Sequence, residues 1–150
     1  MTMQSRASPI EVRKAATAAD ARGAALVYQA AFSERVKLET LAGKLSDPDF
    51  LFGVALGLDV VLGLVLVAKS GDPAKFNVHY VCAHPIDAPH GTGRALMAWA
   101  EAEAILAGAT HIRLAVRRKN VGARRFYAHL GYQTLDERDV GFTLIKRVTK

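Results

Sequence analysis

The 150-residue chain has little cysteine and no long apolar run. Its one cysteine, Cys82, cannot form an internal disulfide, and its apolar surroundings predict a buried thiol of a reducing compartment. No apolar stretch reaches the roughly 18 residues of a membrane-spanning helix. The longest block, 54–68, is interrupted by two glycines and an aspartate, and the first nine residues contain no signal-peptide core. We therefore expect a cytoplasmic protein without a membrane segment.

Internal repeats, low-complexity stretches and linkers rich in proline or serine are also absent, and the chain has only five prolines. Half of the residues (51%) are hydrophobic, enough for one sizeable core. The sequence therefore predicts a single domain over residues 9–150, preceded by a flexible polar N-terminus at 1–8.

Two further absences limit the chemistry. No set of His, Cys, Asp and Glu has metal-ligand spacing, which predicts no metal site. The net charge of +6 favours an anionic partner, such as nucleic acid, an acidic surface or a phosphorylated cofactor. However, no helix-turn-helix pair, RNA-binding strand motif or series of stacking aromatics accompanies the cations. These cations gather in one window, at Arg113, Arg117, Arg118, Lys119, Arg124 and Arg125.

Hydrophobic periodicity predicts an alternation of strands and helices. We expect strands at 10–13, 50–58, 60–69, 75–83, 111–116, 132–135 and 140–148, with 50–58 and 60–69 forming a hairpin. Helices are expected at 21–32, at 34–44 after a Ser33 cap, at 93–106, and after an Asn120 cap up to Gly131. On the strand at 75–83, regular alternation would place His79 and Tyr80 on opposite faces. The order indicates a mixed α+β domain.

Two glycines one residue apart, Gly91 and Gly93, stand where the strand at 75–83 turns into a helix. Such a turn can direct backbone N–H groups and a helix N-terminus at a phosphate. Glycine at these positions removes the Cβ atoms that would block close approach. Alone, the signal is weak, because Gly-x-Gly turns are common in proteins that combine helices and strands.

A second motif follows about thirty residues later, from Asn120 to Tyr132, and reads Asn-x-x-Ala-x-x-Phe-Tyr-x-x-x-Gly-Tyr. The pair of motifs resembles the GNAT superfamily of acyl-CoA-dependent N-acyltransferases, whose pyrophosphate signature is Arg/Gln-x-x-Gly-x-Gly/Ala. The order of elements is similar over the whole chain. The resemblance implies a GNAT fold: a central, mixed but mostly antiparallel, twisted sheet of six or seven strands with about four flanking helices.

The resemblance also implies a site for acetyl-CoA. The pyrophosphate would lie on the turn, and the pantetheine arm along the strand at Val81, Cys82 and Ala83, where a backbone N–H would polarise the thioester carbonyl. Asn120 would bind the pantetheine side, and Arg94, or Arg124 and Arg125, would add positive charge near the phosphates. The implied turn residues are Pro89, His90, Gly91, Thr92, Gly93 and Arg94. For the cation cluster we rank contact with CoA first, ordinary solvation second and nucleic acid third.

The implied reaction is direct attack of a primary amine on the thioester in a ternary complex. Tyr127 would protonate the leaving thiolate, for which a phenol with a pKa of about 10 is a plausible acid. Without the second motif, a core aromatic on an amphipathic helix would be the favoured interpretation of Tyr127. His79 is the best candidate for the base, against the alternative of a packed histidine. The amine remains unidentified, and a homodimer pairing through the C-terminal strand at 142–148 is a reasonable expectation.

Three departures from the family pattern bear on these expectations. Ala88 stands where Arg or Gln is usual, and Pro89, which has no N–H, replaces a common glycine. Ribosomal-protein N-terminal acetyltransferases carry Glu five residues before the motif asparagine, whereas this chain has Ala115. The alternatives are therefore a catalytically weak CoA-binding or interaction module and, third, a basic nucleic-acid-binding protein.

Overall fold

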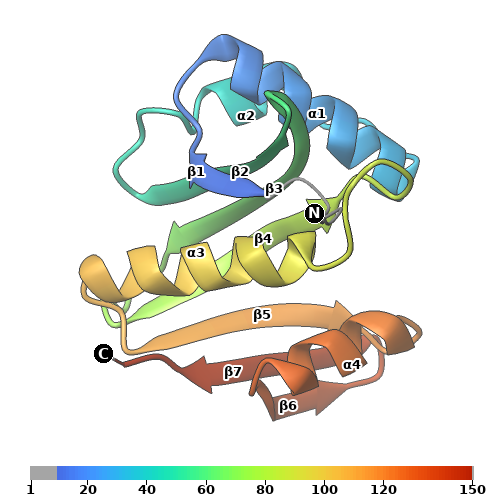
Figure 1. The fold of residues 1–150 in the computed structure, drawn as a ribbon. Coiled ribbons are helices and arrows are strands. Elements are labelled where there is room, and N and C mark those ends of the chain that lie inside the picture. The colour runs from blue at the N-terminus through green and yellow to red at the C-terminus, as the bar shows by residue number, and fades with distance from the viewer. Residues whose placement is uncertain (1–9, 150) are drawn as a thin grey trace, which may run out of the picture.

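The computed structural model describes residues 10–149, which form seven strands and four helices around one sheet (Figure 1). The predicted flexible N-terminus at 1–8 lies outside the described residues. The strands are β1 (Glu11–Lys14), β2 (Phe50–Gly57), β3 (Val60–Lys69), β4 (Lys75–Ala83), β5 (His111–Arg117), β6 (Gln133–Arg138) and β7 (Gly141–Arg147). The helices are α1 (Ala18–Phe32), α2 (Leu38–Ala42), α3 (Thr92–Leu106) and α4 (Val121–His129). This α+β arrangement confirms the predicted fold class.

The sheet has the order β1-β2-β3-β4-β5-β7-β6, and every neighbouring pair is antiparallel except β4 and β5. The expectation that the C-terminal strand offers a free edge is wrong. β7 lies between β5 and β6, because the β6–β7 hairpin folds back and covers its second side. The two edges of the sheet are therefore β1 and β6.

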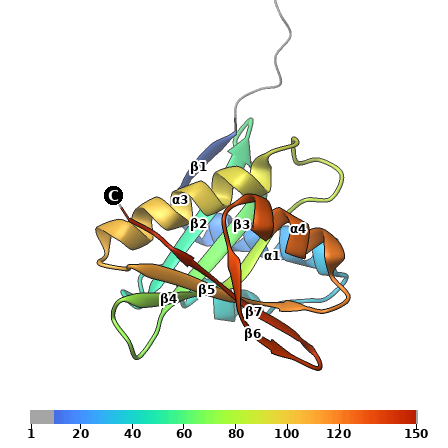
Figure 2. The same cartoon turned by 90° about the horizontal axis from the view of Figure 1, so that it is seen from below.

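Two hydrophobic clusters cover the two faces of the sheet. One joins α3 and α4 to the strands through residues such as Leu96, Met97 and Tyr127. The other joins α1 and α2 to the strands through Val27, Leu41 and Leu64, among others. Figure 1 shows α1 and α2 beside the β1–β3 end, while α4 lies beside β6 and β7. In Figure 2 the tip of the β6–β7 hairpin projects away from α3. The face opposite α3 is thus covered over the first strands only.

The first helix begins with a reciprocal cap. Thr17 accepts a hydrogen bond from the Asp20 N–H, and the Asp20 carboxylate accepts from the Thr17 N–H, as in a capping box. Asp20 also pairs with Arg13 of β1 at 2.8 Å, which lowers the pKa of this buried carboxyl to about 2. The pair therefore fastens α1 to the edge strand of the sheet.

The second helix is shorter than its periodicity predicts. Ser33 was expected to cap it, but Ser33 adopts a left-handed conformation (φ 55°) and ends α1. Its N–H bonds the Gln29 carbonyl, as at other helix C-termini. Helix α2 begins only at Leu38, after a connecting segment. Local capping preference could not distinguish the start of one helix from the end of another here.

Candidate active site

The site begins where β4 and β5 diverge. These parallel strands pair only over Lys75–Asn77 and His111–Arg113, although β4 continues to Ala83 and β5 to Arg117. Beyond Asn77, β4 stays paired with β3 alone. The β4 edge at Val81, Cys82 and Ala83 therefore faces the opening with backbone groups that no strand within residues 10–149 takes up. An extended ligand arm can pair with such an edge.

The glycine turn lies at the end of this open edge and leads into α3. Gly91 is the N-cap of α3 with φ 95°, a conformation that L-residues rarely adopt. The Pro89 carbonyl accepts two hydrogen bonds from Thr92, one from its N–H and one from its buried hydroxyl at 2.6 Å. The turn is thus held by its own residues before any ligand arrives.

Not all of the predicted N–H groups remain available in the turn. Pro89 has none, and Thr92 has already donated to Pro89. The N–H groups of His90, Gly91, Gly93 and Arg94 donate to no other residue in 10–149. Four N–H groups at a helix N-terminus remain, which is the kind of site that binds a phosphate oxygen.

The two glycines serve different purposes. A Cβ on Gly91 would meet nothing within 4 Å, so its space is open for a ligand. A Cβ on Gly93 would lie 3.3 Å from Phe126 Cζ of α4. The expectation that Gly93 clears space for the phosphate is therefore incomplete, because Gly93 also lets the aromatic ring of the second motif pack against the first. The two motifs meet in space at this point.

Helix α4 presents the second motif. Asn120 accepts a hydrogen bond from the Ala123 N–H at 3.1 Å and caps the helix. Its amide nitrogen donates to no residue in 10–149. Tyr127 is only 8% exposed and packs edge-on against Phe126 and Tyr132.

The Tyr127 hydroxyl remains accessible to solvent despite this packing. It forms no hydrogen bond within residues 10–149, yet no buried side-chain oxygen or nitrogen there lacks a partner. The hydroxyl therefore reaches solvent. Burial, with a smaller contribution from the nearby Cys82 thiol, raises the pKa of Tyr127 to about 12. Burial likewise raises the pKa of Cys82 to about 12, which keeps this thiol neutral and argues against a nucleophilic role.

A bulge in β4 changes the direction of its side chains. The register skips His79, since Leu66 pairs with Tyr80 and Val67 pairs with Val78. The expectation that His79 and Tyr80 occupy opposite faces is therefore wrong. Their rings lie 6.4 Å apart, and both neighbour the cluster below α1 and α2, His79 through Phe50 and Tyr80 through Tyr28. Partial burial of the ring and the Lys44 ammonium lower the pKa of His79, which favours its neutral form.

The remaining predicted residues divide between the turn and the hairpin. Arg94 and His90 are exposed at the turn. His84 accepts hydrogen bonds from the Ile86 and Asp87 N–H groups through Nδ1, and so shapes the loop. Arg124 lies 4.0 Å above the Phe142 ring, where Arg118 also packs at 4.8 Å. The Arg124 guanidinium therefore contacts β7 and not the glycine turn. It would have to leave the Phe142 ring to contact a phosphate bound at the turn.

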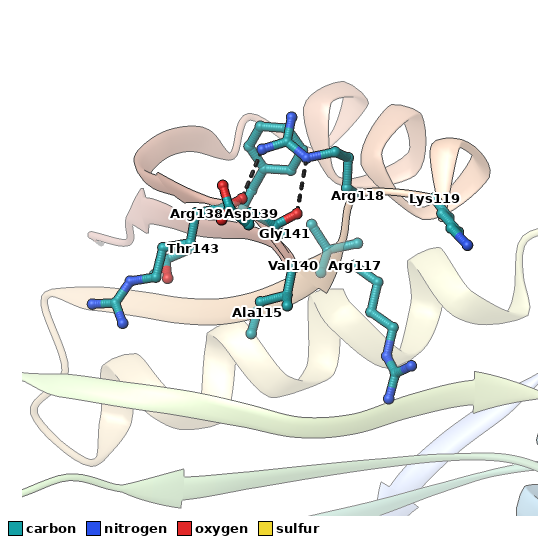
Figure 3. Close-up of a pocket in the computed structure, with 11 residues that line it drawn as sticks. Ala115, Arg117, Arg118, Lys119, Arg138, Asp139, Val140, Gly141 and Thr143 are labelled. Carbon is teal, nitrogen blue, oxygen red and sulfur yellow. Dashed lines mark hydrogen bonds between the residues drawn. The ribbon is translucent and has the colours of Figure 1, made fainter.

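Sequence reasoning missed a pocket beside the diverging strands. A cavity of about 820 Å³ lies between the end of β5 and the β6–β7 hairpin, lined by residues 115–119 and 138–143 (Figure 3). A smaller one of about 340 Å³ adjoins it and shares Ala115 and Thr143. The alternation of Arg113, Ala115 and Arg117 was visible in the sequence, but the facing hairpin was not.

Within residues 10–149, no three His, Cys, Asp or Glu side chains are grouped to hold a metal ion. No helix of the same stretch has the length and apolar character to cross a membrane.

Comparison with known proteins identifies the family. Solved structures with the same fold include the ribosomal-protein-S18-alanine N-acetyltransferase of Escherichia coli (TM-score 0.79, 18% identity, 95% of this chain and 96% of that one). The PaiA N-acetyltransferase of Thermoplasma acidophilum, solved with coenzyme A, has a TM-score of 0.73 at 19% identity, over 93% and 99% of the two chains. Nourseothricin acetyltransferase reaches 28% identity at a TM-score of 0.61, over 68% and 67%.

No curated protein sequence matches the chain. The profile of the acetyltransferase (GNAT) family, however, matches residues 16–132. That match includes both motifs and most of the chain, so the chain belongs to the GNAT N-acetyltransferase family.

Proposed function

We propose that this chain transfers an acetyl group from acetyl-CoA to a primary amine, which attacks the thioester directly in a ternary complex. The observation that carries the proposal is the open β4 edge, which has free N–H groups at one end and the Tyr127 hydroxyl beside it. Holding both reactants in line supplies much of the rate, so no covalent enzyme intermediate is required.

The residues fit the donor in a definite order. The N–H groups of His90, Gly91, Gly93 and Arg94 bind the pyrophosphate, with the dipole of α3 behind them. The backbone of Val81, Cys82 and Ala83 pairs with the pantetheine arm and polarises the thioester carbonyl. The free amide of Asn120 binds the same arm from α4. Arg124 contributes charge once its guanidinium leaves the Phe142 ring.

In the reaction, the amine nitrogen forms a bond to the acetyl carbon, the carbon–sulfur bond breaks, and the amine loses a proton. Tyr127 acts at the departing sulfur. Because its pKa is about 12, complete proton transfer to a thiolate with an ordinary thiol pKa of about 8.5 is uphill. The hydroxyl therefore first donates a hydrogen bond to the developing negative charge and then passes its proton to the thiolate. Tyr127 regains a proton from solvent, while the proton of the ammonium leaves to the base.

Acetyl-CoA binding is the first test. Calorimetry should show micromolar affinity for acetyl-CoA, with at least roughly 100-fold weaker binding of acetyl-pantetheine, which lacks the pyrophosphate that the turn would hold. Thiol release with amide formation should then follow when amines are added. Equal affinity for both donors would contradict the role of the turn, and no binding of either would remove the proposal.

One observation favours the alternative of a catalytically weak CoA-binding module. Pro89 and the internally bonded Thr92 leave the turn with fewer free N–H groups than its length allows. Micromolar binding of acetyl-CoA without thiol release from any amine would select this alternative.

His79 is the proposed base, acting on the amine directly or through water. Its pKa lies below the ordinary 6.5, so above pH 6.5 the His79 imidazole is neutral and can accept a proton. We expect kcat/KM to fall as the pH drops through the His79 pKa. In His79→Gln this loss should disappear from the profile, with activity roughly 100-fold lower at pH 8.

A matched pair of variants tests whether the His79 pKa causes the loss of kcat/KM at low pH. Lys44→Gln removes the neighbouring cation, so the acid side of the profile should move to higher pH. Lys69→Gln, an exposed lysine on β3, should leave it unchanged. An unaltered acid side in His79→Gln would show that another group, or the amine itself, gives up the proton.

A further inference from the structure

The cavity beside β5 (Figure 3) shares Ala115 and Thr143 with its smaller neighbour, and the two form one groove on the sheet face opposite α3. Small residues make up the floor, namely Ala115 of β5 and Thr143 of β7. These two are cross-strand partners. The absence of bulk on this floor leaves space for part of a small molecule.

The groove starts where the proposed reaction occurs. Arg113 and Asn77, which line its inner end, are the last residues to pair before β4 and β5 diverge. His79 follows Asn77 by two positions on β4, and its ring neighbours Phe50 on this same side of the sheet. An amine held at the opening between the strands therefore has the groove as the nearest space for the rest of its structure.

The groove carries positive charge without matching negative charge. Five cations line it, and Asp139 is its one acidic lining residue. Two of the cations are neutralised, Arg118 by Glu137 and Arg138 by Asp136, each at 2.9 Å. Among residues 10–149, no carboxylate lies within 4.0 Å of the cationic groups of Arg113, Arg117 or Lys119.

Two of these unpaired cations are well placed for a ligand. Arg113 Nε donates a hydrogen bond to Oδ1 of the neutral Asn77 amide at 3.1 Å, which fixes the guanidinium at the inner end of the groove. Arg117 is exposed at the end of β5, and in Figure 3 its side chain extends toward β4. A planar guanidinium suits a carboxylate or phosphate, because it offers two parallel N–H donors.

We propose that this groove selects the acceptor, and that the acceptor is a small primary amine bearing its own anionic group, a carboxylate or a phosphate. The inference rests on the proposed function. Arg117 holds the anionic group, while the amine reaches the thioester. A polycationic amine meets repulsion at the same place.

The test compares amines of similar size. With acetyl-CoA saturating, thiol release should be measured for 3-aminopropionate, 2-aminoethyl phosphate, the neutral 2-methoxyethylamine and the cationic 1,3-diaminopropane. We expect kcat/KM to be at least about tenfold higher for an anionic amine than for the other two, as for a charge-assisted hydrogen bond. The carboxylate and phosphate arms show which anion fits.

The variant Arg117→Gln should lower kcat/KM for the preferred anionic amine about tenfold, through KM, and leave the neutral amine unaffected. Arg147→Gln, which removes the same charge from the far end of β7, should change neither. Thermal unfolding and acetyl-CoA affinity should match wild type in both variants, since both arginines are exposed.

Binding provides a readout that does not need turnover. Ligand-observed NMR with the CoA complex should detect the anionic amines, and Arg117→Gln should weaken that signal. Preference for neutral or cationic amines, or equal effects of the two arginine variants, overturns the inference while acetyl-CoA-dependent thiol release preserves the proposed function. Failure of acetyl-CoA to bind overturns both.

Discussion

Replacing Tyr127 with Phe should lower kcat by roughly 100- to 1,000-fold, the cost of removing one well-placed donor at a developing negative charge. The hydroxyl lies in a largely buried site, where such a hydrogen bond is worth more than in water. The change removes one oxygen and keeps the ring that packs against Phe126 and Tyr132. Turnover should therefore fall while the fold persists. Steady-state thiol release at saturating acetyl-CoA measures it.

The affinity for acetyl-CoA separates this role from a structural one. We expect the Kd of Tyr127→Phe to stay within about threefold of wild type, because the hydrogen bond strengthens only as charge develops on sulfur. The pH profile adds a second check. With a pKa of about 12, Tyr127 stays protonated from pH 6 to 10, so its ionisation should cause no decline there. A large loss of affinity with unchanged kcat would contradict the catalytic role.

Replacing Gly141 with Ala should destabilise the protein by about 3 kcal/mol or more, as for other severe steric conflicts in a packed interior. A Cβ at this position would collide with the Val116 carbonyl oxygen and lie 3.0 Å from the Arg117 Cα. These are backbone atoms of β5, which hydrogen bonds hold from both sides at its start and from β7 along its length. The strand therefore cannot move away cheaply.

Gly71→Ala is the matched control. Its Cβ would meet nothing within 4 Å and its φ is not positive, so unfolding free energy should be unchanged or rise by up to about 1 kcal/mol. Urea unfolding followed by circular dichroism measures both variants. A loss below about 1 kcal/mol for Gly141→Ala would mean that the β5–β7 pairing adjusts more readily than its register indicates. Acceptor selectivity would then depend less on a rigid groove floor.

The order of elements was predictable because it depends on local patterns. Strand β4 was predicted with its observed bounds, since apolar residues at 75–83 are closed by Pro73 and Pro85. The helix after the glycine turn began one residue earlier than expected, at Thr92. The failure at Ser33 has the same local origin, because serine is favoured at the start of a helix and here occupies a left-handed C-terminal position.

The bulge at His79 illustrates what a single strand cannot reveal. Regular alternation assigned His79 and Tyr80 to opposite faces, and only the pairing with β3 showed that His79 is skipped. A bulge depends on two strands and their register, so neither segment encodes it alone. For this reason His79, the proposed base, and Tyr80 lie on the same face of the sheet.

By itself, the sequence determined the fold class and the two motifs, because spacing, glycine positions and hydrophobic periodicity are local or near-local properties, and the resemblance of those motifs indicated the family. The tertiary structure alone decided which strands form the edges of the sheet, how the Phe126 ring packs against Gly93, and where β4 and β5 diverge. It also assembled the cationic groove, whose walls come from strands separated in the chain. Such features depend on long-range pairing, in which the partner of each residue is set by the whole sheet.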